Sequence, residues 1–401
     1  MSTSGLSKSR LQRMHDVMDG YVERGEISGL VTVLARRDAV HIDAIGLRDV
    51  ESGRPMEPDT IFRIASMTKP VTAVAAMMLV EEARLRLDDP IDAWLPELAD
   101  RQVLRGIDSS LDDTVPAVRP ISLRDLMTFR LGIGAVMTAP GTAPIQEAME
   151  AGGVAPGPMP SSHDPDAWMQ RLGALPLVHQ PGEGWLYHTG PDVLGVLISR
   201  VTGMSLESFL RERILEPLSM VDTTFHVPDT KIERLATCYE HNASTGALTV
   251  QDPARDGAWS RPPAFPSGGG GLVSTAGDFL AFARMLLGGG QGDHGRMLAR
   301  PSVELMTTDH ITPRQKADYP FYPGFWHNTG WGFGVEVVTG RDGVDRSPGS
   351  YGWVGGFNTH WYNDPAENLV GMLLFQCQMG GPAPQTIDRD FWPLAYAAID
   401  D

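Results

Sequence analysis

The sequence predicts an α/β lobe built from both ends of the chain, with a mainly helical lobe inserted between its halves. Two β-rich runs, 29–35 and 40–46, lie near the N-terminus, and further strand-like runs follow residue 330. Between these ends, the periodic segments are mainly helical and are separated by long loops rich in Pro and Gly. We therefore expect a discontinuous α/β lobe at 1–65 and 266–401 and a helical lobe at 66–265.

The first half of the α/β lobe is expected to contain a helix, a hairpin and a short strand. Apolar residues recur at helical spacing over 11–22, which predicts an amphipathic helix. The two β-rich runs that follow are joined by the charged turn 36–38, which favours an antiparallel hairpin. The run 61–64 predicts a short strand that leads the chain into Ser66.

The helical lobe begins with a strongly apolar, Ala- and Met-rich run that predicts a buried helix from residue 72 to about 87. Further helices are predicted at 123–129, 167–172, 192–201 and 206–215. By contrast, 151–160 is too rich in Gly and Pro to form an element. It predicts a surface loop that could border a substrate pocket.

The second half of the α/β lobe follows the glycine-rich segment 266–271. Thr275 and Asp278 have the spacing of a helix cap and predict a helix at 279–287. Strands and a last helix are then predicted in this order: 331–338, 353–362, 368–376 and 389–399.

Composition excludes several classes of function. A formal net charge of −17 repels phosphate backbones and anionic membranes, so nucleic acid and membrane partners are not expected. No apolar run has the length of a membrane span, and the N-terminus lacks the apolar core of a signal peptide. Cys238 and Cys377 are isolated, which favours free thiols in a reducing compartment and leaves a disulfide open. We expect a cytoplasmic protein without a metal or cofactor. The sequence does not determine whether the chain forms a homo-oligomer.

The strongest chemical signal is Ser66 followed three residues later by Lys69, at the start of the buried helix. This spacing is close to one helical turn and brings the amine within reach of the hydroxyl. A serine needs a neighbouring base to act as a nucleophile, and a lysine desolvated by apolar surroundings can serve as one. Lys69 is one of only four lysines, and it leads into an apolar run. The alternative is a serine cap followed by a solvated lysine.

Two later segments could complete a site. Tyr187 lies on a loop between glycines, and a nearby lysine ammonium would favour its phenolate, so Tyr187 could accept the Ser66 proton. Alternatively, its ring only anchors the loop. The glycines of 352–359 could let a ligand approach a strand, or could mark a bulge.

Five motifs in order resemble the serine β-lactamase-like family, and most closely its family VIII carboxylesterases. They are 66–69, 185–187, 266–270, 331–334 and 352–355. The resemblance implies an antiparallel sheet flanked by helices with an inserted helical lobe, the β-lactamase/transpeptidase-like fold, with the site at the junction.

The same resemblance implies residue roles. Ser66 would be the acylated nucleophile, and Lys69 and Tyr187 would share the general base and acid steps. The backbone N–H groups of Ser66 and Gly356 would form the oxyanion hole. Trp353, Val354, Gly355 and Thr189 would contact the substrate.

Several positions depart from the family pattern. Val354 replaces a usual glycine, Thr189 replaces the asparagine of lactamases, and Trp353 replaces their third-motif lysine. An indole there favours an uncharged ester over an anionic lactam. His188 begins a His-Thr-Gly that lies too early to be the third motif. The segment 126–132 also differs, and Arg130 has no explanation.

The main hypothesis is a serine carboxylesterase (EC 3.1.1.-) that cleaves small or short-chain esters through an acyl-enzyme. The alternatives are an acyltransferase, a β-lactamase or D-amino-acid peptidase or amidase, and a non-catalytic penicillin-recognising domain. The aromatic stretch 319–326, inside the loop 310–330, could line an acyl pocket, pack internally or contact a subunit.

Overall fold

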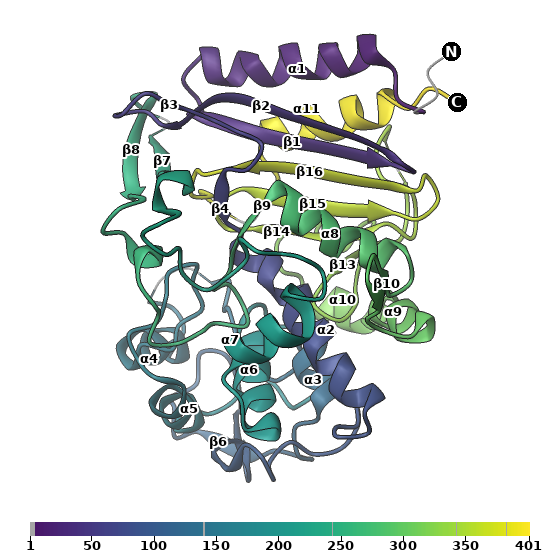
Figure 1. Cartoon of the computed structure of the whole chain (residues 1–401). Helices are drawn as coiled ribbons and strands as arrows, with labels where there is room; N and C mark the ends of the chain where they lie inside the picture. Colours follow the sequence, from purple (N-terminus) through teal and green to yellow (C-terminus); the bar gives the residue numbers. More distant parts are fainter. Residues whose placement is uncertain (1–4, 139–140, 243, 342, 382) are drawn as a thin grey trace.

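The main sheet has eight antiparallel strands drawn from both ends of the chain (Figure 1). The computed structural model describes residues 5–138, 141–242, 244–341, 343–381 and 383–401, so the first four residues of the predicted lobe lie outside the described residues. In spatial order the strands are β12 (Thr329–Trp331), β13 (Glu336–Val338), β14 (Tyr351–Gly355), β15 (Thr359–Asp364), β16 (Leu369–Phe375), β1 (Gly29–Arg36), β2 (Ala39–Asp49) and β3 (Arg54–Pro55).

Strand β1 lies inside the sheet, and all eight of its residues are buried. It pairs with β2 as the predicted hairpin and with β16 from the far end of the chain, so Val33 lies between Ile42 and Met372. A strand covered on both faces reads as a continuous apolar run, which explains its sequence. The antiparallel sheet that the resemblance implies is therefore present.

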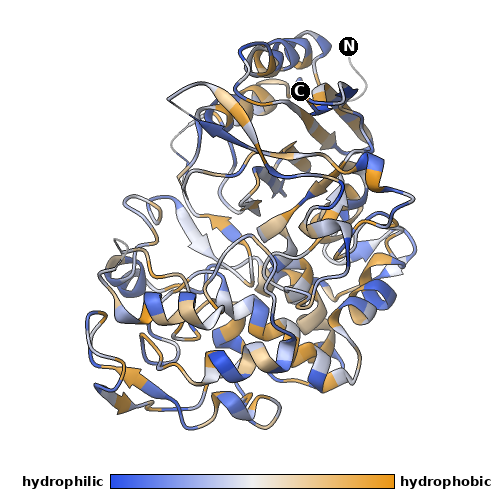
Figure 2. Ribbon diagram, turned by 90° about the vertical axis from the view of Figure 1, so that its left-hand side faces the viewer, coloured by the Kyte–Doolittle hydropathy of each residue, from blue (hydrophilic) through white to orange (hydrophobic). Residues whose placement is uncertain are grey.

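Helices cover both faces of this sheet. Helix α1 (Lys8–Glu23) and helix α11 (Thr386–Ala397) pack together over one face (Figure 1). Hydrophilic and hydrophobic residues alternate along α1 in Figure 2, as predicted for an amphipathic helix. Helix α8 (Ala276–Leu287) packs against the opposite face, and its first turn is capped by Thr275, which accepts a hydrogen bond from the Asp278 N–H.

Two predicted strands are wrong, because each is a hairpin. The run 331–338 is divided between β12 and β13 by a turn in which Gly334 has a φ of +73°. The run 353–362 is divided between β14 and β15 by a turn in which Asn358 has a φ of +64°. A residue with a positive φ is no longer in the strand conformation, and Gly and Asn are the residues that adopt a positive φ most readily.

The helical lobe contains more elements than the sequence predicts. Its helices are α2 (Thr68–Glu81), α3 (Leu123–Met127), α4 (Pro144–Gly152), α5 (Pro165–Gly173), α6 (Thr189–Thr202) and α7 (Leu206–Leu210), which continues as a π-helical turn, Arg211–Leu215. Two hairpins were not predicted, β5–β6 (Gln102–Leu104, Thr114–Pro116) and β7–β8 (Cys238–Asn242, Ala247–Asp252). Outside this lobe, α9 (Arg300–Met306) and α10 (Pro313–Asp318) were also missed.

Helix α2 is shorter than predicted. It ends at Glu81 instead of near residue 87, because Ala83 turns the chain with a φ of +57°. The predicted loop 151–160 is also corrected at its start, since residues 151 and 152 complete α4. The boundaries of the two lobes stay a prediction.

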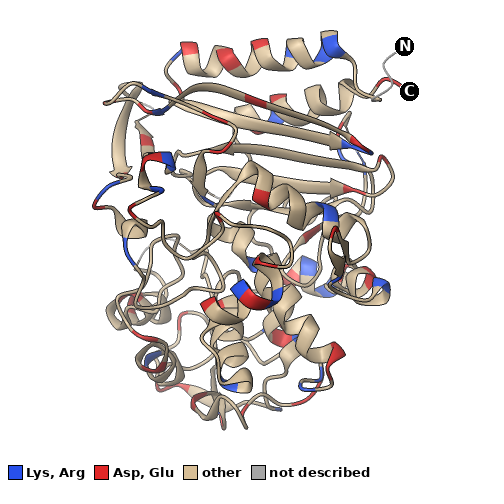
Figure 3. Cartoon of the chain, viewed as in Figure 1, with Lys and Arg blue, Asp and Glu red and all other residues tan. Residues whose placement is uncertain are grey.

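Acidic and basic residues are spread over the molecule. Figure 3 shows Lys and Arg positions interspersed with Asp and Glu positions. Cys238 and Cys377 are both buried and free.

Within the described ranges, no single helix is long and apolar enough to cross a membrane. Among those same described residues, the one helix pair that meets the length and composition together is α6 with α7 and its π-helical turn, and this pair is bent by 81°.

Candidate active site

Ser66 lies in a short 3-10 turn, η1 (Ala65–Met67), between strand β4 (Ile61–Arg63) and helix α2. Strand β4 pairs with β9 (Val273–Thr275), which fixes the point where the chain enters this turn. Ala65, just before the serine, has a φ of +42°, a conformation that is costly for a residue with a Cβ. The strained turn therefore places Ser66 directly before the N-terminus of the buried helix α2.

Lys69 is fully buried in the first turn of α2. Its Nζ lies 2.7 Å from Ser66 Oγ and 2.6 Å from the carbonyl oxygen of Gly269. The predicted proximity of the amine and the hydroxyl is therefore present in the structure. Burial lowers the pKa of Lys69 to about 7, although the Asp192 carboxylate acts in the opposite direction. At neutral pH a large fraction of this amine is therefore unprotonated and can accept a proton.

The glycine-rich segment 266–271 holds the buried helix in place. Thr72 donates a hydrogen bond to the Gly268 carbonyl at 2.8 Å, and the Leu272 N–H donates to Thr68 Oγ1 at 3.1 Å. A Cβ on Gly268 would lie 2.5 Å from the Pro191 carbonyl oxygen, so only glycine allows this approach. No role of the Gly269 carbonyl was predicted, and the run of four glycines was the only signal for it.

Tyr187 completes a hydrogen-bonded group with Ser66. Its phenol oxygen accepts a hydrogen bond from the Trp353 indole at 2.6 Å and also contacts the Ser66 side chain. Burial raises the pKa of Tyr187 well above its usual value. The expectation that Lys69 favours the phenolate is therefore wrong in this structure, because desolvation outweighs any benefit from the amine. Tyr187 is a protonated phenol beside a weakly basic amine.

Aromatic packing also fixes the Tyr187 ring. It lies against Phe129, Trp185 and Phe321, with ring centroids 5.8, 5.9 and 5.0 Å away. Lys69 Nζ lies 4.5 Å from the centre of the Tyr187 ring. The ring is therefore both a loop anchor and a neighbour of the serine, so the two alternatives for Tyr187 are compatible.

A cavity of about 250 Å³ opens over Ser66. Trp353, Val354 and Gly356 line it from β14 and the following turn, and Phe321 contributes from the aromatic stretch. The loop residues 156–158 border it, as predicted. Among the described residues that line this cavity, none carries an Asp, Glu, Lys or Arg side chain.

Two predicted substrate contacts do not line this cavity. A Cβ on Gly355 would lie 2.4 Å from the Ile64 carbonyl oxygen, so this glycine packs against the turn before Ser66. Thr189 is buried at the first turn of α6 and faces a neighbouring cavity that includes 153–157. Neither residue therefore lines the cavity over Ser66, and substrate contact at these two positions stays a prediction.

Arg130 has a structural explanation. Its Nε donates a hydrogen bond to Thr128 Oγ1 at 2.9 Å, and its carbonyl accepts from the Gly182 N–H at 2.8 Å. These contacts hold the loop that carries Tyr187 against the end of α3. The neighbouring Phe129, with a φ of +61°, directs its ring under Tyr187.

Sequence reasoning missed His188. The His-Thr-Gly that it begins was set aside, but its ring lines the cavity and its Nδ1 lies 3.3 Å from Lys69 Nζ. His188 Nε2 lies 3.3 Å from Asp192 Oδ2. The only signal in the sequence was the i, i+4 spacing of a histidine and an aspartate at the start of a helix.

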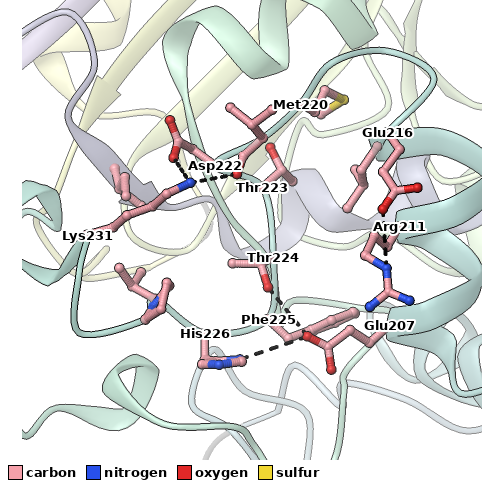
Figure 4. Close-up of a pocket in the computed structure, with 15 residues that line it drawn as sticks. Glu207, Arg211, Glu216, Met220, Asp222, Thr223, Thr224, Phe225, His226 and Lys231 are labelled. Carbon is pink, nitrogen blue, oxygen red and sulfur yellow. Dashed lines mark hydrogen bonds and ion pairs between the residues drawn. The ribbon is translucent and has the colours of Figure 1, made fainter.

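A second pocket, of about 400 Å³, lies between the end of α7 and the segment 220–231, and shares no lining residue with the Ser66 cavity (Figure 4). Its charged side chains face one another: Lys231 pairs with Asp222 at 2.6 Å, and Arg211 with Glu216 at 3.5 Å. This mutual pairing is typical of structural ion pairs. Within the described part of the chain, no cluster of His, Cys, Asp or Glu could hold a metal ion.

Comparison with known proteins agrees with this architecture. The family model described as "Beta-lactamase" matches residues 14–391. Protein Rv1367c of Mycobacterium tuberculosis is 40% identical over 366 residues, covering 88% of this chain and 87% of its own. Esterase EstB of Burkholderia gladioli is 30% identical over 381 residues, covering 90% and 89%.

Among solved structures, "EstCE1, a hydrolase with promiscuous acyltransferase activity" is similar with a TM-score of 0.78. It is 26% identical, and the match covers 98% of this chain and 99% of that one. The match therefore spans the sheet and the inserted helices together. Because the family match also extends over nearly the whole sequence, the chain belongs to the β-lactamase family, with the β-lactamase/transpeptidase-like fold.

Proposed function

We propose that this protein is a serine carboxylesterase of the family VIII type, which cleaves small, uncharged esters through an acyl-enzyme on Ser66. One observation carries the proposal: Ser66 Oγ lies 2.7 Å from a buried amine whose pKa falls to about 7. A hydroxyl so placed has a base that works at neutral pH. The esterase name of the relative EstB supports the same reaction class.

In the proposed acylation step, Ser66 Oγ attacks the ester carbonyl carbon while its proton passes to Lys69 Nζ. The backbone N–H groups of Ser66 and Gly356 would stabilise the oxyanion. As the intermediate collapses, Tyr187 gives its hydroxyl proton to the leaving alkoxide and regains one from Lys69. Water then attacks the acyl carbon, the proton transfers reverse, and a carboxylic acid leaves with Ser66 restored.

The lining of the cavity favours an uncharged substrate. Since the described side chains that line the cavity over Ser66 include no Lys or Arg, an anionic group would be desolvated there without a partner. Trp353 occupies the position at which lactamases have a lysine, and its indole N–H is already bonded to Tyr187. We therefore expect esters to be preferred over β-lactams and peptide C-termini.

The test is hydrolysis of p-nitrophenyl acetate, butyrate and octanoate by the wild type and by Ser66→Ala. A chromogenic cephalosporin is assayed in parallel, and a fluorophosphonate probe reports whether Ser66 is labelled. We expect ester turnover that Ser66→Ala abolishes, with an acid limb in the pH–rate profile near pH 7. Ester turnover that survives Ser66→Ala, or an unlabelled wild type, would refute the mechanism.

An acyltransferase is the second candidate, because it shares the acyl-enzyme. The name of the structural relative EstCE1 includes a promiscuous acyltransferase activity. Transfer would be detected by adding a primary alcohol and measuring whether the product shifts from acid to ester. Cephalosporin turnover that equals ester turnover would instead favour a β-lactamase.

A further inference from the structure

The backbone at His188 adopts a rarely occupied conformation. Its φ of +82° and ψ of −56°, together with a hydrogen bond from the Thr189 N–H to the Tyr187 carbonyl at 3.2 Å, define the rarer type of γ-turn. A residue with a Cβ is strained there, and such strain persists only where the surroundings hold it in place. In this turn the Tyr187 and His188 rings meet edge to face, with centroids 5.9 Å apart, and both lie beside Lys69 Nζ.

His188 bridges Lys69 and an aspartate. Its Nδ1 lies 3.3 Å from Lys69 Nζ, and its Nε2 lies 3.3 Å from Asp192 Oδ2, one turn further along α6. Burial and the amine both lower the pKa of His188, so the ring is neutral. A neutral imidazole carries one N–H, and the carboxylate can only accept. The proton therefore lies on Nε2, which leaves Nδ1 as an acceptor facing the amine.

Asp192 also holds a second partner of Lys69. Its Oδ1 accepts hydrogen bonds from Ser267 Oγ at 2.5 Å and from the Gly269 N–H at 2.9 Å. Burial opposes its ionisation, but contacts with His188 and Ser267 keep the pKa of Asp192 below its usual value. The carboxylate thus positions both the imidazole and the Gly269 peptide, whose carbonyl accepts from Lys69 at 2.6 Å.

The hydrogen-bond capacity of Lys69 then determines where its lone pair points. A neutral amine has two N–H donors and one lone pair, and Nζ has three partners here. The Gly269 carbonyl can only accept, and with Nε2 protonated His188 Nδ1 can also only accept. Both N–H donors are used on these two partners, so the lone pair faces Ser66, whose hydroxyl can donate.

We propose that His188 and Asp192 are positioning residues that hold the amine of Lys69 with its lone pair directed at the Ser66 hydroxyl. The inference rests on the proposed function of the Ser66 site and adds two residues to it. Neither residue exchanges a proton with the substrate; they act by fixing the donors and acceptors around the base.

Asp192→Asn is a sharp test because the structure predicts how the new amide must lie. The Gly269 N–H needs an acceptor at the Oδ1 position, so the amide oxygen stays there and the NH₂ group faces His188 Nε2. The imidazole must then protonate on Nδ1 and donate to the lone pair of Lys69. We expect kcat/KM for p-nitrophenyl acetate to fall by about 100-fold or more.

His188→Asn provides the matched background. Asn tolerates positive φ, and its carbonyl can accept from Lys69 without depending on a tautomer. In this background, Asp192→Asn should lower kcat/KM by less than about fivefold, because neighbouring residues that act through one another are non-additive. His188→Gln, whose amide reaches toward Asp192 but leaves Lys69 without this acceptor, should lose more activity than His188→Asn.

The pH profile is a second readout. The groups facing Lys69 are Tyr187 from its loop, His188 from the γ-turn and Asp192 from α6. Since Asp192 raises the pKa of Lys69, Asp192→Asn should move the acid limb of kcat/KM to lower pH. Looser packing that admitted water to Lys69 would instead raise its pKa and move this limb to higher pH, because burial is what lowers the pKa.

The outcomes separate this inference from the proposed function. Two outcomes overturn the inference if the wild type is still labelled by the fluorophosphonate. In the first, Asp192→Asn lowers kcat/KM equally in the wild-type and His188→Asn backgrounds. In the second, it lowers kcat/KM by less than about threefold and the acid limb does not move. If Asp192→Asn does not fold, the comparison of His188→Asn with His188→Gln decides, and equal activity of these two variants overturns it. An unlabelled, inactive wild type overturns both proposals.

Discussion

Burial of Lys69 predicts a specific pH dependence of stability, which Lys69→Met can isolate. The pKa of Lys69 falls from 10.5 to about 7 in the folded protein. Between these values the unfolded state binds more protons than the native state, so the free energy of unfolding rises with pH. Below pH 7 both states are protonated and the full penalty is present; above the unfolded pKa the penalty disappears.

The magnitude follows from the two pKa values. The shift destabilises the native state by about 4 kcal/mol at pH 7 and by about 2 kcal/mol at pH 9. Lys69→Met has a similar volume and removes this penalty, but it also loses three hydrogen bonds of about 1 kcal/mol each. The variant should be more stable than the wild type by about 1 kcal/mol at pH 7 and less stable by a similar amount at pH 9.

Urea unfolding of both proteins at pH 7, 8 and 9 measures this difference. Other titrating groups are shared and cancel, so the wild type should gain about 2 kcal/mol relative to Lys69→Met across the range. A difference that stays constant with pH would refute the lowered pKa of Lys69, and with it the assignment of Lys69 as a base at neutral pH. Ester turnover by the variant should fall by about 100-fold or more.

Three further changes test separate parts of the structure. Tyr187→Phe should lower kcat by about 100-fold or more for an alkyl ester and by less for a p-nitrophenyl ester, whose leaving group needs no proton; both rates are measured together. Val354→Ala widens the cavity and should raise the octanoate-to-acetate ratio of kcat/KM by about 3- to 10-fold. Arg63→Met leaves Asp252 buried without its partner and should lower the free energy of unfolding by about 3–5 kcal/mol in urea.

The parts of the fold that follow local patterns were predictable. The hairpin of β1 and β2, the amphipathic helix α1 and the capped helix α8 each have a periodicity or a turn within the element itself. The errors lie where one residue reverses the chain inside an apolar run, as Gly334 does between β12 and β13. Such a run has the same composition as one long strand, and only the tertiary contacts distinguish the two.

In the candidate active site, too, contacts set by local sequence were predictable and contacts set by tertiary packing were not. Ser66 and Lys69 are three residues apart on one turn, so their contact followed from helical geometry. The contacts of Lys69 with Gly269 and of Trp353 with Tyr187 join residues 200 and 166 positions apart. Those pairs depend on how the lobes pack, and periodicity carries no information about them. The role of the buried Asp192 carboxylate was not predicted either, because its contact with Gly269 also depends on tertiary packing.

The sheet, rather than the helical lobe alone, determines where the nucleophile lies. Thr359 on β15 donates a hydrogen bond to the Ile64 carbonyl at 3.1 Å, and Gly355 packs against the same carbonyl. This carbonyl precedes the strained Ala65, so the β14–β15 turn holds the backbone that presents Ser66. The same turn brings Gly356 to the cavity. Contacts of the β14–β15 turn with the Ile64 carbonyl thus fix both Ser66 and the predicted second oxyanion donor, which gives a physical reason for a sheet built from both ends of the chain.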